Sequence, residues 1–191
     1  MTSQTQYWNR LIQPGIVALV GAGGKTTVLS KLVEYGRLQG QPIVVTTTTQ
    51  LYESQVAQYE PIYTKDINDV DEYCTKRIQQ GYCGAWFNGI TRTKVDAVDC
   101  ESIDGLSALH PNWQIVVEAD GAKEKWLKAP KQTEPVIPNQ TKTTIGVVNL
   151  QMLGASLDED HVHNLELVQS IVHREEGAIV TPHMLAQIVL H

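Results

Sequence analysis

The sequence predicts a three-layer α/β fold in which a mainly parallel sheet lies between two layers of helices. Short runs of β-branched and other apolar residues recur without polar alternation, which is typical of strands covered on both faces. A polar or glycine-rich cluster follows each run at once, and helix-like stretches lie between several of them. The expected strands are residues 16–20, 43–45, 115–117, 145–148 and 178–180.

Three stretches between these runs have the spacing of helices. Residues 26–39 place several leucines and a valine on one stripe, and Gly40 and Pro42 follow as stop signals. Residues 68–79 and 157–173 are the other two candidates. Since crossovers in parallel sheets are right-handed, all strand C-termini are expected along one edge, where ligands bind.

The middle of the chain is less regular. Residues 85–90 read as a strand interrupted at Asn88-Gly89, and residues 91–99 can supply a hairpin partner. We assign no function to this region from its sequence.

Length and composition indicate one globular domain over residues 1–191, with 42% hydrophobic and 19% charged residues. The net charge of −6 argues against a nucleic-acid partner. The N-terminal residues lack the apolar stretch of a signal peptide, and residues 16–20 are too few to span a bilayer. We therefore expect a cytoplasmic protein without a membrane partner, and its three cysteines are expected to be reduced.

A glycine-rich segment between the first strand and the first helix has the features of a phosphate-binding loop. Glycines let backbone N–H groups wrap a phosphate, and the helix adds its positive N-terminal end. Lys25 would contact the β- and γ-phosphate oxygens, and the Thr26 hydroxyl would bind Mg²⁺. The segment consists of Gly21, Ala22, Gly23, Gly24, Lys25, Thr26 and Thr27.

This loop is a short form of the Walker A motif. The first glycine of GxxxxGK[ST] would fall on Leu19, inside the strand, so the spacing is GxxGKT. Such a loop resembles the nucleotide loop of Mur-type ligases. A glycine-rich turn before a helix is also a common structural device, but the following Lys-Thr favours phosphate.

Four threonines, Thr46, Thr47, Thr48 and Thr49, follow the second strand at the same predicted sheet edge. Thr46 can help to hold a γ-phosphate, and Thr47 can position the attacking water. The alternative is a plain strand end, since threonine favours β structure.

The third strand ends in two acids, as a Walker B element does. Because side chains alternate along a strand, Glu118 and Asp120 are expected on one face, addressing one Mg²⁺. In this assignment Glu118 binds the metal and Asp120 positions water. A solvated strand end is the alternative.

Lysines follow these acids directly. Lys123, Lys125 and Lys128 surround Trp126 and can form a cationic flap over the phosphates, with Lys128 as a nucleotide-binding residue. Lysines on a loop are also often merely solvated. His161 and His163 are two residues apart, which does not put ligands on one helix face, so we do not assign them to a metal site.

The ordered motifs resemble the YqeC family of selenium-dependent hydroxylase accessory proteins. The matching segments are VGAGGKTT at 20–27, VTTT at 45–48, VEADG at 117–121, LKAP at 127–130, EPVIP at 134–138, HVH at 161–163, VHR at 172–174 and IVTP at 179–182. The resemblance implies a P-loop-like nucleotide-binding protein associated with maturation of selenium-dependent molybdenum hydroxylases. A molybdenum hydroxylase or its maturation proteins are the partners it implies.

The chain departs from the family pattern at Asn149, Gln151 and Asn164, where a glycine, an acid and an arginine are expected. Members of the family also continue beyond the position of His191, so we expect a C-terminal segment of the family to be missing here.

The sequence hypothesis is thus an NTPase that binds ATP or GTP with Mg²⁺ through a single P-loop-like domain. Two alternatives stay open: an NTP-dependent transferase or Mur-like ligase, and a nucleotide sensor without turnover.

Overall fold

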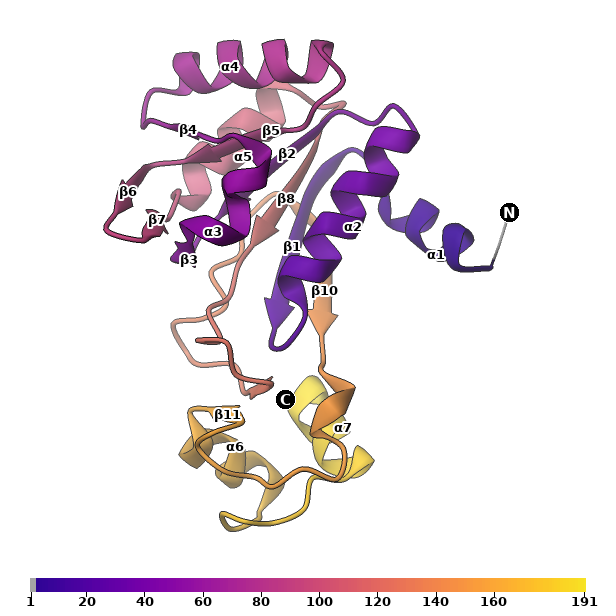
Figure 1. The fold of residues 1–191 in the computed structure, drawn as a ribbon, viewed down its shortest axis with the longest axis vertical. Helices are drawn as coiled ribbons and strands as arrows, with labels where there is room; N and C mark the ends of the chain where they lie inside the picture. The colour runs from indigo at the N-terminus through magenta and orange to yellow at the C-terminus, as the bar shows by residue number, and fades with distance from the viewer. Residues whose placement is uncertain (1–2) are drawn as a thin grey trace.

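The computed structural model describes residues 3–191 and has a six-stranded parallel sheet at its centre (Figure 1). The strand order is β10-β1-β8-β2-β5-β4, so β1 lies between β10 and β8. The prediction of a three-layer fold with a mainly parallel sheet is confirmed. The strands are β1 (Gly15–Gly21), β2 (Ile43–Thr47), β4 (Ile62–Tyr63), β5 (Gly84–Phe87), β8 (Gln114–Glu118) and β10 (Thr141–Val147).

Helices cover both faces of this sheet because its strands are apolar on both sides. In β1, Val17 and Leu19 pack with the helices of one layer, and Ile16 and Ala18 pack with those of the other. The first layer contains α1 (Ser3–Leu11), α2 (Lys25–Leu38) and the short α3 (Glu53–Val56), which continues into the 3₁₀ turn η1 (Ala57–Tyr59). The second contains α4 (Ile67–Gln79) and α5 (Cys100–Leu109).

A small antiparallel sheet extends from the carboxyl ends of the central strands. Its order is β3-β7-β6, with β3 at Leu51–Tyr52, β7 at Lys94–Asp96 and β6 at Gly89–Thr91. The interruption predicted at Asn88-Gly89 falls at Asn88 alone, because β5 ends at Phe87 and Gly89 already begins the β6–β7 hairpin.

The C-terminal part packs around a third hydrophobic cluster beyond the carboxyl edge of the sheet (Figure 1). It contains the parallel pair β9 (Leu127–Lys128) and β11 (Val162–His163), together with α6 (Leu165–Val172) and α7 (Pro182–Leu190). The 3₁₀ turn η2 (Leu150–Met152) connects β10 to this part.

Two expectations for this part are wrong. The helix predicted over 157–173 is limited to α6, because Asp158 accepts the His161 N–H in a tight turn and Asn164 takes a left-handed φ of 59°. Residues 178–180 form no strand of the central sheet. Their backbone bonds instead to residues 154–157, with one bridge between Ser156 and Ile179.

None of the helices within residues 3–191 combines the length and the apolar character that crossing a bilayer requires.

Candidate functional site: a glycine-loop cavity

The glycine-rich loop lies between β1 and α2, as predicted, and its backbone depends on glycine. Gly21 has a φ of +97°, and a Cβ at this position would lie 2.2 Å from the Val147 carbonyl oxygen of β10. Only glycine allows so close an approach. The loop therefore runs tightly against β10, and the first turn of α2 presents backbone N–H groups that lack intrahelical partners.

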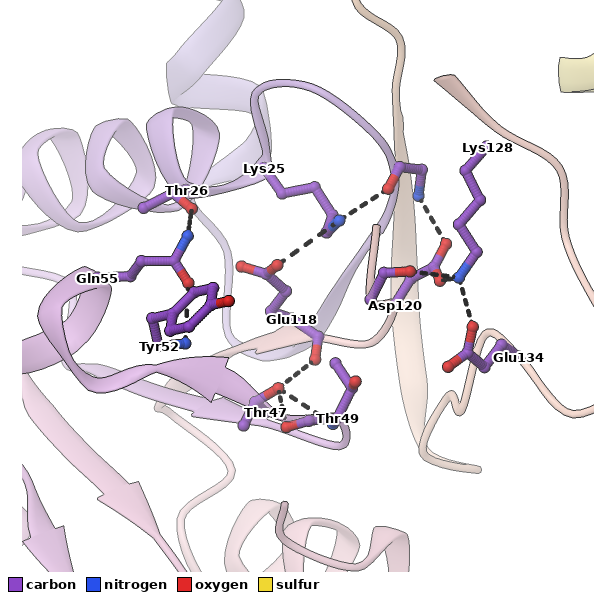
Figure 2. A network of polar contacts seen from close by, with 12 residues as sticks. Lys25, Thr26, Thr47, Thr49, Tyr52, Gln55, Glu118, Asp120, Lys128 and Glu134 are labelled. Carbon is purple, nitrogen blue, oxygen red and sulfur yellow. Dashed lines mark hydrogen bonds and ion pairs between the residues drawn. The ribbon is translucent and has the colours of Figure 1, made fainter. Parts of the chain in front are cut away.

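The loop forms one wall of a cavity of about 480 Å³ at the carboxyl edge of the sheet. Figure 2 shows polar side chains of the cavity, such as Lys25, Thr26 and Glu118, together with others that lie behind it. Residues far apart in sequence meet here because parallel strands end at the same edge. The lining comprises Gly23, Gly24, Lys25, Thr26, Thr49, Gln50, Leu51, Tyr52, Gln55, Lys94, Glu118, Gly121, Ala122, Lys123, Glu124, Lys125, Trp126, Glu134, Asn149 and His163.

Lys25 and Glu118 form the charged centre of the cavity. The Lys25 Nζ donates to the Gly21 carbonyl at 2.7 Å and lies 3.6 Å from Glu118 Oε1. Both residues are buried, at 5% and 6% exposure. Burial raises the pKa of Glu118, and the neighbouring Lys25 opposes that rise. A buried ammonium and a buried carboxylate thus lie directly beside the loop.

Thr26, at the start of α2, is connected to the opposite wall of the cavity. Gln55 of α3 donates from Nε2 to Thr26 Oγ1 at 3.4 Å, and its Oε1 accepts the Tyr52 N–H at 3.1 Å. The hydroxyl predicted to bind metal therefore lines the same cavity as Glu118 (Figure 2).

The four threonines at the end of β2, two within the strand and two after it, have different roles. The Thr46 hydroxyl donates to the Trp86 carbonyl, and the Thr47 hydroxyl bonds to the Glu118 carbonyl at 2.7 Å. The Thr48 hydroxyl donates to the Val136 carbonyl. Of the four, Thr49 lines the cavity, whereas the predicted Thr46 and Thr47 join the strands behind it.

The structure separates the two acids expected to share one face. Side chains alternate regularly only within a strand, and β8 ends at Glu118. The next residue, Ala119, donates its N–H to the Leu19 carbonyl, and its own carbonyl accepts the Val136 N–H. Asp120 consequently lines a second cavity of about 140 Å³ on another side of the loop. The expectation that the two carboxylates lie on one face, in one site, is wrong.

Asp120 holds the loop from behind. Its Oδ2 accepts the Gly21 N–H at 3.0 Å, and its Oδ1 accepts from Lys128 Nζ. Lys128 also donates to the Gly121 carbonyl at 2.7 Å and to Glu134. The Lys128 and Asp120 side chains are 1% and 4% exposed. Figure 2 shows that this group and the Lys25–Glu118 pair lie on two sides of one backbone segment, and the Gly21 peptide groups link them.

The residues predicted to form one cationic flap therefore lie in two different places. Lys123, Lys125 and Trp126 line the main cavity, as the flap requires. Lys128 is buried among its carboxylate partners and does not line that cavity, because β9 pairs with β11 and draws it inward.

The histidines after the acidic cluster also lie apart. His161 Nδ1 bonds to Asp158, whereas His163 lines the main cavity, and burial together with nearby lysines lowers its pKa. Within the described range 3–191, His, Cys, Asp and Glu side chains do not gather in groups of three suited to a metal ion.

A magnesium–nucleotide complex fits the residues that are present. Mg²⁺ prefers hard oxygen ligands and is commonly held by one or two carboxylates together with substrate phosphates, the rest of its shell being water. Glu118 and Thr26 offer a carboxylate and a hydroxyl in one cavity beside the loop. This donor set suits a metal that arrives with phosphate oxygens.

Sequence reasoning missed several cavity residues. Tyr52, Gln55 and Lys94 come from short elements around the antiparallel sheet. Asn149, which the sequence marked only as a departure from the family pattern, follows β10 and lies against Gly23. The predicted hairpin could have directed attention to Lys94. Glu134 belongs to the EPVIP segment, which attracted notice through family resemblance alone.

Comparison with known proteins assigns the chain to a family. The family model described as "YqeC protein" matches residues 17–166, a range that includes the whole cavity lining. The chain belongs to the YqeC family. It is similar to "Uncharacterized protein YqeC" of Escherichia coli (strain K12), with 28% identity over 180 residues that cover 94% of this chain and 69% of that protein. No solved structure matches this family member.

Proposed function

We propose that this YqeC-family chain binds a nucleoside triphosphate with Mg²⁺ and hydrolyses it. The observation that supports this most is the convergence of the glycine loop, Lys25, Thr26 and Glu118 on one cavity. A loop at a helix N-terminus, a lysine and a carboxylate together match the needs of a polyphosphate and its metal.

The residues divide the work as follows. The loop N–H groups and Lys25 bind the phosphates, for which Lys25 gives up its bond to the Gly21 carbonyl. Glu118 and Thr26 hold Mg²⁺, which when bound neutralises charge on the β- and γ-phosphates.

The water-positioning role proposed for Thr47 passes to Thr49, because Thr49 lines the cavity. Asp120 acts as a positioning residue that fixes the Gly21 backbone.

The biological role proposed here is that of an accessory protein in the maturation of selenium-dependent molybdenum hydroxylases. It rests on the family resemblance. A molybdenum hydroxylase or one of its maturation proteins is the corresponding partner, and ATP or GTP is the nucleotide.

A thermal-shift panel of ATP, GTP, CTP and their diphosphates, with and without Mg²⁺, tests nucleotide binding. A ligand at one hundred times its Kd stabilises the native state by about 2.7 kcal/mol, which raises Tm by about 5–10 °C for a chain of this size. We expect Lys25→Ala to abolish the shift and the exposed Lys76→Ala of α4 to retain it. Equal shifts in the parent and Lys25→Ala would contradict the loop assignment.

Two further measurements separate the mechanistic alternatives. Thr26→Ala is expected to bind nucleotide but to lose the increment that Mg²⁺ adds. Steady-state phosphate release at saturating nucleotide distinguishes a hydrolase from a sensor, and product analysis with candidate acceptors reveals a transferase or ligase.

A further inference from the structure

The cavity has a second wall, which stands at the metal-binding end of the glycine loop. Gln55 bonds both to the Thr26 hydroxyl and to the Tyr52 backbone. Under the proposed function, Thr26 marks the position of Mg²⁺ and hence of the β- and γ-phosphates. The wall that continues from Gln55 therefore faces the terminal phosphate.

Strand pairing fixes the two outer side chains of this wall. In the antiparallel pair of β3 and β7, Leu51 is opposite Val95, and Tyr52 is opposite Lys94. Leu51 and Val95 are buried in the core and anchor the pair. Tyr52 and Lys94 are the cross-strand pair next to these two residues, and both line the cavity, to which Leu51 also contributes.

The Lys94 ammonium is held by an aromatic ring. Its Nζ lies 5.1 Å from the centroid of the Tyr52 ring, within the range of a cation–π interaction. This contact restrains a flexible side chain without neutralising it. The N–H donors of the Lys94 side chain are available to another group.

The charges of the cavity leave Lys94 without a carboxylate. Glu118 pairs with Lys25, and Glu134 pairs with Lys128. Lys123, on the loop after β8, also lines the cavity. No ion pair within residues 3–191 includes Lys94 or Lys123. The remaining carboxylate of the lining, Glu124, is exposed to solvent, as is Lys123, whereas Lys94 is half-buried. This wall thus offers positive charge to an anion inside a cavity.

We propose that Tyr52 and Lys94 form an oxyanion subsite that holds the carboxylate or phosphate group of a second substrate beside the terminal phosphate of the nucleotide. The position relative to the nucleotide rests on the proposed function, whereas the subsite itself rests on the strand pair and its charge. A second anion next to a triphosphate is repelled unless cations compensate it, and Lys94 and Lys123 supply that compensation. The cavity thereby gains a place for an acceptor as well as for nucleotide.

Isothermal titration of inorganic phosphate into protein saturated with Mg²⁺ and a non-hydrolysable triphosphate tests this subsite. In that complex the glycine loop is filled, so added phosphate reports on the second wall. We expect phosphate to bind, with a Kd that rises about tenfold or more in Lys94→Ala, since a charge-assisted hydrogen bond is lost. Lys94→Arg should restore most of the affinity, and the exposed Lys65→Ala should leave it unchanged.

Three results would overturn the proposal: no phosphate binding to the loaded parent protein, equal phosphate affinity in the parent and Lys94→Ala, or a loss of nucleotide affinity in Lys94→Ala as large as the loss of phosphate affinity. The last result would assign the wall to the nucleotide itself.

If the parent protein binds no triphosphate, the proposed function fails, and the subsite is tested separately. Phosphate is then titrated into nucleotide-free Lys25→Ala protein, which lacks the loop cation. Weaker binding on adding Lys94→Ala would support the subsite, and unchanged binding would overturn it. Thermal unfolding of every variant confirms that it is folded.

Discussion

Replacing Lys128 by methionine should destabilise the fold, because Lys128 compensates a buried carboxylate. Its side chain is 1% exposed and that of Asp120 is 4% exposed. Removing one partner of a buried ion pair costs about 3–5 kcal/mol, since the other charge is left without a counter-ion. In this variant Asp120 still accepts the hydrogen bond from the Gly21 N–H, and the Glu134 side chain, which is 29% exposed, can be hydrated. We therefore expect the lower end, about 3 kcal/mol, or a Tm decrease of about 6–12 °C.

Urea unfolding followed by tryptophan fluorescence measures this change in the free energy of unfolding. Lys131→Met is the matched control, because Lys131 is a neighbouring but exposed lysine and should change stability little. Adding Asp120→Asn to Lys128→Met should recover part of the loss, since the fully buried carboxylate is then gone and only the partly exposed Glu134 has lost its partner. A loss below about 1 kcal/mol in Lys128→Met, or an equal loss in the control, would refute the reasoning.

Three other expectations concern Glu118, the loop and the thiols. Burial raises the pKa of Glu118, so protons begin to compete with the metal for this carboxylate at a higher pH than they would at an ordinary glutamate. Nucleotide titrations should therefore show that the gain in affinity from Mg²⁺ falls as the pH is lowered toward that pKa. Glu118→Gln should lack this gain at every pH. Gly21→Ala should unfold at a clearly lower temperature than Gly40→Ala, because both glycines have positive φ but only a Cβ at Gly21 meets backbone; equal Tm values would argue against the clash. Burial raises the pKa of Cys74 to about 12, so mass mapping after brief alkylation of native protein should find Cys100 modified and Cys74 unmodified, and early modification of Cys74 would contradict its burial.

The central sheet could be predicted from sequence because burial on both faces leaves a continuous apolar run. Residues 16–20 and 115–117 both carry this pattern, and both are strands of the sheet. Residues 178–180 carry the same pattern, yet Ile179 is 59% exposed and pairs by a single bridge. A short apolar run does not distinguish a sheet strand from a segment that contributes only its alternate residues, here Ala178 and Val180, to a core.

Local patterns could also predict the glycine loop but not the partners of its charged residues. The direction of Asp120 depends on where β8 ends, and the burial of Lys128 depends on β9 meeting β11 from a distant part of the chain. The roles of Thr46 and Thr47 likewise depend on carbonyls of neighbouring strands. Such contacts are set by tertiary structure and leave no mark in local spacing.

The position of β1 in the sheet also governs when the loop can form during synthesis. Both neighbours of β1 come from late in the chain, since β8 begins at Gln114 and β10 at Thr141, whereas β2, β5 and β4 can pair with one another earlier (Figure 1). At about 5–20 residues per second, roughly 5–20 s separate the synthesis of β1 from that of its first partner. During that interval both edges of an apolar strand are unpaired, and such edges promote association with other chains. Until β8 is made, the strand that later carries the glycine loop is therefore a segment of the nascent chain that needs protection from aggregation.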